Sequence, residues 1–420
     1  MSKKNIIVYP AQMGLRNNGI LQVQVVSDVS AYPIENAVVQ IFNKKDPATL
    51  LEKLTTDISG RTPEIELAAP SIEYSLEPTE FQPYTEYIVI VTAGGFQMVV
   101  INSAQVLPVI KSIQPVSMPP LVPGSDTIKA ITIGSNYLSG TYTPNVYEDE
   151  VKDYAEEEGA KPVVIPEFII VHNAIPSNST AKNYKVEYVS YIKSVVSSQI
   201  YATWPQEAIY ANILTILSFT LNRIYTKWYA RQGYDFDITS TVAFDHKWFY
   251  GRNIYSNISN AVDYIFNYYL SRPGIIQPIL TQYCRGELAV CPNLISLWHS
   301  KTLASQGYTA IEILRYSYGD TIYINSSNKI TGVGLLWPGM DLILGSTGEA
   351  VQHIQNQLVV TAGAYKAITI PEDDGTYGPA TVAAVSTFQE IFNLPVTGVV
   401  DAAAWYKISR VYARLTRVQT

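Results

Sequence analysis

Residues 374–405, DGTYGPATVAAVSTFQEIFNLPVTGVVDAAAW, decide the fold of the C-terminal part of the chain. An Asp-Gly turn is followed by a proline at the start of a helix, and an apolar bend then leads into another helix. Upstream, LGSTGEAVQHIQNQL at 344–358 opens with glycine-containing turns and places Val351, Ile354 and Leu358 on one apolar stripe. This order of elements predicts a bundle of three helices over residues 336–420.

The pattern of glycines and apolar positions in this stretch resembles the three-helix peptidoglycan-binding module. The resemblance implies that the turn at 374–379, with Asp374 and Tyr377, and the later Trp405 form or support a groove for the bacterial cell wall. We therefore expect residues 336–420 to bind peptidoglycan. The matching positions are Gly345, Gly348, Gln355, Asp374, Gly375, Gly378, Thr381, Ala384, Val385, Phe388, Gln389, Leu394, Gly398 and Trp405.

The composition is that of a globular chain, with 47% hydrophobic and 15% charged residues. Its 420 residues are enough for two or three domains. The net charge of −7, without a Lys/Arg cluster, argues against nucleic acid as a partner. The most apolar run, 208–225, contains Asn212, Asn222 and Arg223, so we expect a buried helix rather than a membrane span. The beginning, MSKKNIIVYPAQMG, has no apolar segment typical of a secretory signal.

The N-terminal part is expected to be a small β domain. Segments such as ILQVQVVS, NAVVQIFN, YTEYIVIVTAGGF and QMVVINS are rich in β-branched residues, and turn signals separate them. The spacing predicts an antiparallel β-sandwich over residues 1–118, similar to the carboxypeptidase-regulatory or transthyretin type. We interpret it as a leader that packs or assists folding and carries no chemistry.

Residues 119–162 are expected to form a linker that is first rich in proline and then acidic. Its second half, YEDEVKDYAEEEGAKP at 147–162, contains seven acidic residues in sixteen. One interpretation is a solvated helix face or spacer. The other is an exposed junction, accessible to proteases, between a leader and a mature enzyme.

Residues 163–330 are predicted to form an α+β domain. We expect helices over 205–231, 257–272 and 310–319, with shorter β-prone pieces between them. Tyrosines are frequent here and suit either sugar-ring stacking or a core. Cys284 and Cys291 could form a disulfide, supply half a metal site or stay free. The four histidines show no ligand spacing, so we expect neither a metal nor a cofactor.

Three blocks of this middle part stand out as candidates for chemistry. They are WPQEAIYAN at 204–212, YDFDITSTVAFDHKWFYGR at 234–252, and the long run from QYCRG to TIYI at 282–324. In this order they resemble the stage II sporulation protein D family of lytic transglycosylases. Three positions depart from the usual pattern, since Leu297 and His299 replace a glutamine and a glycine around Trp298, and His246 replaces another glutamine.

The resemblance implies that Glu207 is the catalytic acid, which protonates the glycosidic oxygen and then accepts the proton of the sugar C6 hydroxyl. A second carboxylate is not obligatory for this reaction, unlike in most glycoside hydrolases. A glutamate in a first helical turn is equally typical of a helix cap. We assign supporting roles to Asp237, Asp245 and Ser296, and substrate contacts to Trp204, Tyr283 and Trp298.

The order of a β-sandwich, a sporulation-protein-D-like domain and a peptidoglycan module resembles the clostridial germination-specific spore cortex-lytic enzymes, which are made as proenzymes. This implies a spore protein associated with the cell wall, cortex peptidoglycan as the substrate, and a subtilisin-like germination protease as the activator. The family also implies an amidase activity, for which the sequence offers no zinc-ligand set. A catalytically degenerate wall-binding paralogue and a phage-type lysin stay open as alternatives.

Overall fold

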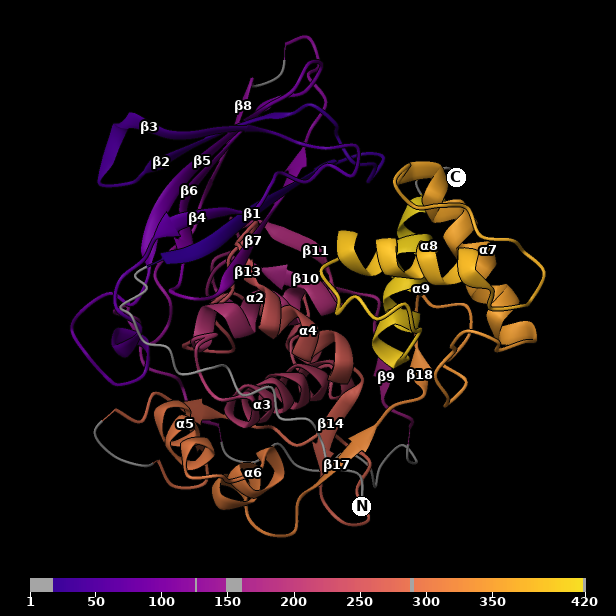
Figure 1. Ribbon diagram of the computed structural model, residues 1–420. Coiled ribbons are helices and arrows are strands. Elements are labelled where there is room, and N and C mark those ends of the chain that lie inside the picture. The colour runs from indigo at the N-terminus through magenta and orange to yellow at the C-terminus, as the bar shows by residue number, and fades with distance from the viewer. Residues whose placement is uncertain (1–17, 125–126, 149–160, 288–290, 418–420) are drawn as a thin grey trace.

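The chain folds into N-terminal β-sheets, a mixed middle part and a C-terminal helical region. The computed structural model describes residues 18–124, 127–148, 161–287 and 291–417. Figure 1 shows the sheets in indigo and purple above the mixed part, and the C-terminal helices in orange and yellow beside both. In the described residues, no helix has the length and apolar character needed to cross a membrane.

Two sheets enclose the N-terminal core. One has the strand order β13-β7-β1-β4 and the other β3-β2-β5-β6-β8. Their inward side chains form one apolar cluster that includes Val23, Val39, Val89 and Ile101, because apolar residues alternate along the strands. The strands are β1 (Asn18–Ser27), β2 (Val38–Asn43), β3 (Asp46–Thr55), β4 (Ile65–Ala68), β5 (Thr85–Thr92), β6 (Met98–Val106), β7 (Lys111–Met118) and β8 (Ile128–Thr132).

The sheets are mixed rather than purely antiparallel, which corrects the expectation from sequence. Strand β7 pairs with β1 in parallel, and β8 pairs with β6 in parallel. The cause is the connection, since the chain leaves one sheet after β6, adds β7 to the other and returns as β8. The expected linker at 119–162 is therefore also corrected, because its residues 128–132 are a strand of the N-terminal sheet.

The N-terminal part shares a sheet with the middle part. Strand β13 (Ile254–Tyr255) pairs with β7, with Ile254 opposite Ile113. The side chain of Asn253 accepts a hydrogen bond from the backbone N–H of Gln105 at 3.0 Å and donates one to its carbonyl at 2.8 Å. The two parts are thus joined by backbone pairing and not only by side-chain packing.

Helix α3 (Gln206–Tyr225) is the centre of the middle part. It is apolar around its circumference and buried along most of its length, as expected for a helix surrounded by other elements. The other helices are α2 (Tyr188–Gln199), α4 (Ser256–Ile265), α5 (Leu297–Ser305) and α6 (Ala310–Tyr318). The strands are β9 (Val164–Ile165), β10 (Phe168–His172), β11 (Asn183–Glu187), β12 (Ile238–Thr239), β14 (Tyr268–Ser271), β15 (Tyr283–Cys284), β16 (Ile295–Ser296), β17 (Tyr323–Ser326) and β18 (Lys329–Ile330).

Two predicted helices end earlier than expected. The helix predicted at 257–272 stops at Ile265, because residues 268–271 pair with β17 as strand β14. The helix predicted at 205–231 stops at Tyr225, and a short 3-10 turn at Ala230–Gln232 then ends at Gly233, whose φ is +86°. Cys284 and Cys291 form a disulfide, which decides between the alternatives left open by their spacing.

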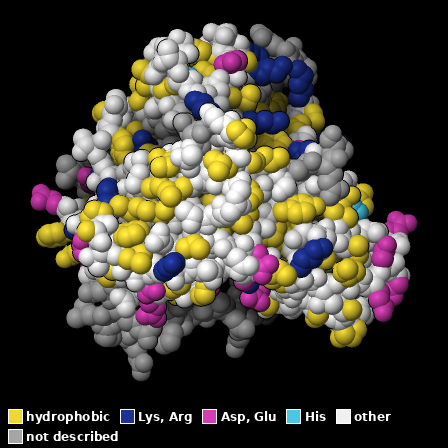
Figure 2. All heavy atoms as spheres, turned by 90° about the horizontal axis from the view of Figure 1, so that it is seen from above, with side chains coloured by type: hydrophobic (Ala, Val, Ile, Leu, Met, Phe, Trp, Pro, Cys, Tyr) yellow, Lys and Arg dark blue, Asp and Glu magenta, His cyan; other side chains and the backbone are white. Residues whose placement is uncertain are grey.

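The C-terminal region contains α7 (Glu349–Ala364), α8 (Pro379–Ile391) and α9 (Ala402–Arg417). The fully buried Gln355 of α7 holds the turn before α8 against this bundle. Its side-chain Nε2 donates hydrogen bonds to the carbonyl of Thr376 and to Thr381 Oγ1, and its Oε1 accepts one from the N–H of Gly375. Helix α9 packs on α4 of the middle part. On the face seen in Figure 2, Lys and Arg side chains gather toward the top, whereas acidic side chains lie mainly at the margins.

Candidate active site

Glu207 lies in the first turn of α3, where the sequence places it. Its Oε2 accepts a hydrogen bond of 2.7 Å from the backbone N–H of Ala310, the first residue of α6. The carboxylate therefore lies at the N-termini of two helices, where negative charge is stabilised. Helix α6 also has its own capping box, in which Glu312 accepts hydrogen bonds from Thr309.

The carboxylate of Glu207 is half-buried, and only one of its oxygens is held. Among the described residues, no hydrogen-bond partner contacts Oε1. The ring of Tyr308, which precedes the α6 capping box, is 42% exposed. A carboxylate oxygen without a hydrogen-bond partner among the described residues and an exposed tyrosine thus flank the same helix start, an arrangement that suits a sugar substrate.

The aromatic residues expected to contact substrate are buried beside this helix start. Trp204 is 3% exposed and Trp298 is 6% exposed, and their ring centroids lie 5.1 Å apart. Tyr201 packs edge-on against both. The indole Nε1 of Trp298 is buried without a hydrogen-bond partner among the described residues. Neither indole face can stack on a sugar unless its cover moves.

The N-terminal part contacts Trp204 at its indole nitrogen. A 3-10 turn at Ile72–Ser75, between β4 and β5, ends in the fully buried Ser75. The indole Nε1 of Trp204 donates to the carbonyl of Ser75 at 2.8 Å, and Thr203 Oγ1 donates to Ser75 Oγ at 2.7 Å. The turn therefore contacts the aromatic cluster at Trp204, three residues before Glu207.

Asp245 is engaged by other protein groups. Its side chain is fully buried and accepts hydrogen bonds from Tyr229 Oη, Thr239 Oγ1 and N, and Arg223 Nε, all within 2.9 Å. The buried guanidinium of Arg223 also binds Glu148 through two hydrogen bonds of 2.8 and 2.9 Å. These contacts give Asp245 a structural role, and they attach the segment before residue 149 to the middle part.

Tyr283 and His246 belong to the core behind this network. Tyr283 is 1% exposed and donates a hydrogen bond to the carbonyl of Asp245 at 2.7 Å. Its ring stacks on His246, with centroids 5.6 Å apart. Burial, assisted by the positive charge of Arg223, lowers the pKa of His246 to about 3. The imidazole is therefore neutral and fills space in the core.

The side chains of the remaining polar candidates in the middle part, Asp237 and Ser296, accept hydrogen bonds from backbone N–H groups. Asp237 Oδ2 accepts from the N–H of Ile170 at 2.8 Å, beside the parallel pairing of β10 and β12, and burial raises the pKa of its carboxyl. Ser296 is 2% exposed, and its Oγ caps α5 by accepting from His299 N. Leu297 is buried at 3% exposure.

The three candidates of the C-terminal region divide into one surface residue and two core residues. Asp374 is exposed, and its Oδ1 accepts from the N–H of Thr376 at 2.8 Å, which lowers the pKa of the carboxyl. Tyr377 is fully buried and bonds the carbonyl of Gly398. Trp405 is 1% exposed, and its Nε1 bonds the carbonyl of Leu335. Both rings can therefore only support a groove from within.

Sequence reasoning missed two contacts that define this region. The hydrogen bond to Ser75 and the ion pair between Arg223 and Glu148 join residues far apart in the chain, and no local pattern indicates either of them. A third feature, the basic face of helix α9, is indicated by a local sequence pattern. Lys407, Arg410 and Arg414 follow the i, i+3, i+7 spacing that places basic residues on one helix face.

Comparisons with known protein families match two regions of the chain, one in the middle part and one in the C-terminal region. Residues 177–265, which include Glu207, match the family described as Stage II sporulation protein. Residues 347–408 match the peptidoglycan binding domain family. The chain therefore carries a sporulation-protein domain in its middle and a peptidoglycan-binding domain at its C-terminal side. Together they indicate a cell-wall-associated protein that acts on or binds peptidoglycan.

No curated protein matches the chain. Among solved structures, the minor pilin GBS52 of Streptococcus agalactiae is 11% identical over 26% of this chain and 48% of its own, with a TM-score of 0.18. Catechol 1,2-dioxygenase from Acinetobacter is 13% identical over 28% of this chain and 57% of its own, also with a TM-score of 0.18. The chain thus spans about half of each, and similarity at this level defines neither fold nor function.

Proposed function

We propose that this protein is a lytic transglycosylase of spore cortex peptidoglycan that is made as a zymogen and acts during germination. The observation that carries the proposal is the position of Glu207. It lies inside the region matched by the sporulation-protein family, in the first turn of α3, with one carboxylate oxygen unengaged among the described residues.

In this mechanism Glu207 first protonates the glycosidic oxygen, so that the glycosidic bond breaks and the leaving sugar departs with its hydroxyl. The carboxylate then takes the proton of the C6 hydroxyl, whose oxygen bonds to the anomeric carbon and closes a 1,6-anhydro ring. No water is consumed, and the proton returns to Glu207. The N–H of Ala310 fixes Oε2 at 2.7 Å, which leaves Oε1 to exchange the proton with the substrate.

The zymogen part of the proposal is supported by the contact between the N-terminal part and Trp204. The turn at Ile72–Ser75 belongs to the N-terminal part, which would be the leader. Its hydrogen bonds to Thr203 and Trp204 attach it to the chain segment directly before Glu207. Activation would follow a cut in the acidic stretch at 147–162 by a subtilisin-like protease, which releases the covalent link to the N-terminal part so that this turn can open. Residues 149–160 of that stretch lie outside the described residues.

The test compares two glutamates that contact the same helix start. Chain cut between residues 149 and 160 is incubated with purified cortex sacculi, and released anhydro-muropeptides are measured by mass spectrometry. Glu207→Gln keeps an acceptor for the N–H of Ala310 but cannot transfer a proton, so release should fall by about 10²–10⁴-fold. Glu312→Gln alters only the capping box of α6 and should stay within a few-fold of the wild type.

The outcomes separate the candidate functions. Equal release by the wild type and Glu207→Gln would reduce Glu207 to a helix cap. Binding to sacculi without release by the cut wild type would favour the second candidate, a wall-binding paralogue without activity. The observation that favours this second candidate is the buried Leu297 where the family usually has a polar glutamine, since a leucine offers substrate no hydrogen bond.

A further inference from the structure

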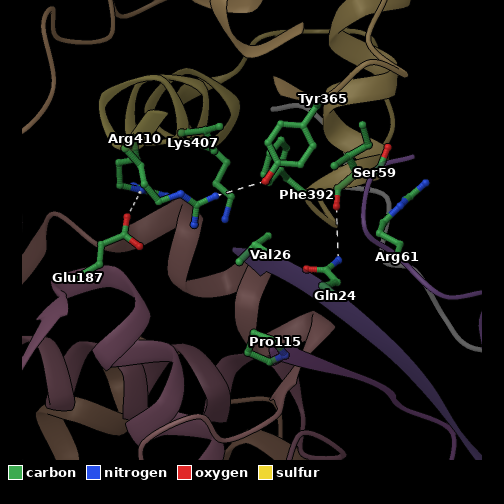
Figure 3. A pocket seen from close by; sticks show the side chains of 13 residues that line it. Gln24, Val26, Ser59, Arg61, Pro115, Glu187, Tyr365, Phe392, Lys407 and Arg410 are labelled. Carbon is green, nitrogen blue, oxygen red and sulfur yellow. Dashed lines mark hydrogen bonds and ion pairs between the residues drawn. The ribbon is translucent and has the colours of Figure 1, made fainter. Parts of the chain in front are cut away.

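A cavity of about 160 Å³ lies where the N-terminal sheets, the middle part and the C-terminal helices meet (Figure 3). Gln24 of β1 and Pro115 of β7 line it from the N-terminal part, and Glu187 at the end of β11 lines it from the middle part. Tyr365 and Phe392 line it from the C-terminal region. The cavity therefore exists only when all three parts are assembled.

The charged residues around this cavity are mostly basic. Arg61, Lys407, Arg410 and Arg414 line it, against the single carboxylate of Glu187. The last three cations share one face of α9, and Figure 3 shows Arg410 extending from that helix toward Glu187. Like charges this close repel one another, so the arrangement needs compensating anions.

Arg410 is compensated only in part. It forms ion pairs with Asp263 at 2.7 Å and with Glu187 at 3.6 Å, and its guanidinium lies over the ring of Phe266. The side chain is nine-tenths buried, yet its Nη1 has no hydrogen-bond partner among the described residues. A buried guanidinium N–H without an acceptor is costly, and an anion in the cavity would supply one.

Lys407 and Arg414 add charge that no carboxylate balances at contact distance. Among the described residues, neither lies within 4.0 Å of an acidic oxygen. Lys407 lies 5.9 Å from the ring centroid of Phe392, and Arg414 donates a long hydrogen bond of 3.5 Å to Tyr365 Oη. Both side chains can therefore turn toward a ligand without breaking an ion pair.

We propose that this cavity binds a small oxyanion, a phosphate or carboxylate group, held by Lys407, Arg410 and Arg414. A cavity of about 150 Å³ accommodates a benzene ring, so there is room for a group of four or five heavy atoms. The planar guanidinium groups match the spacing of oxyanion oxygens. A bound anion would link α9 to the rest of the chain and stabilise the junction of the three parts.

The group could come from free phosphate or from a stem-peptide carboxylate of the cell wall, and only the second source rests on the proposed function. Calorimetry on the full chain, at matched ionic strength in chloride, therefore uses inorganic phosphate in one arm and muramyl dipeptide in the other. These two ligands are the probes, and the proteins compared are the wild type and a Lys407→Gln/Arg414→Gln variant. The control is Lys53→Gln/Lys366→Gln, which removes equal charge from exposed sites.

Binding of either probe by the wild type, weakened about tenfold or more in Lys407→Gln/Arg414→Gln and unchanged in the control, supports the site. Which probe binds identifies the source. Binding of neither probe, or equal binding by the wild type and Lys407→Gln/Arg414→Gln, overturns the proposal. Glycan cleavage is not part of the readout, so this failure is distinct from a failure of the proposed activity.

Discussion

The indole Nε1 of Trp204 donates a hydrogen bond of 2.8 Å to the backbone carbonyl of Ser75, which lies 129 residues earlier in the chain. This bond joins the N-terminal part to the turn that precedes α3. Because Glu207 lies in the first turn of the same helix, displacement of Ser75 would uncover an aromatic surface beside the proposed acid. The relationship gives the zymogen hypothesis a defined point of contact.

Ser75→Arg is expected to activate the uncut chain. Ser75 is fully buried, so an arginine cannot fit there and the turn must leave its site. The change breaks two hydrogen bonds, to Trp204 and Thr203, which corresponds to about tenfold or more in the population of the open form. Release of anhydro-muropeptides from cortex sacculi by the uncut chain should rise accordingly.

The matched control for this experiment is Glu73→Arg. Glu73 is in the same turn but exposed, so the variant carries an arginine in the turn without displacing it. Release should stay at the level of the uncut wild type. If Ser75→Arg releases no more product than Glu73→Arg, while cut wild type is active, the turn does not restrain the enzyme.

A cut between residues 149 and 160 is expected to leave the N-terminal fragment bound. The pairing of β7 with β13, the two bonds between Asn253 and Gln105, and the ion pair of Glu148 with Arg223 all lie outside the cut segment. The two fragments should therefore elute together from a size-exclusion column in native buffer and separate in denaturant. Separate elution in native buffer would show that these contacts do not hold the complex.

Local sequence signals were sufficient for the C-terminal helices and for the position of Glu207. Pro379 and the glycines before α7 fix where helices can begin, and Pro205 does the same for α3. These constraints act within a few residues, so the sequence shows them directly. The matches over residues 177–265 and 347–408 agree with the expected sporulation-protein and peptidoglycan-binding regions.

Contacts between distant residues set the limit of sequence reasoning. Trp204 and Trp298 are suitable residues for sugar stacking, but their burial depends on a turn at residue 75 that no local pattern connects to them. Residues 268–271 continue a helical pattern, and only their pairing with β17 makes them a strand. In each case tertiary pairing overrides local propensity.

His246 is expected to make the protein less stable in acid. Burial, together with the charge of Arg223, holds its pKa at about 3 in the folded chain, against about 6.5 for an exposed histidine. Between pH 6.5 and 3 the unfolded chain therefore binds a proton that the folded chain does not. For one such group the free energy of unfolding falls by about 1.4 kcal/mol for each pH unit lost across this window.

Replacement of His246 with glutamine removes this titration and keeps a side chain that can bond Tyr191 Oη, the present partner of Nδ1 at 3.3 Å. Urea unfolding at pH 7, 6, 5 and 4 measures both chains, so that groups common to both cancel in the difference. The free energy of unfolding of the wild type should fall relative to His246→Gln by about 1.4 kcal/mol per unit below pH 6.5. Parallel curves for the two chains over this range would mean that His246 is not held neutral by burial.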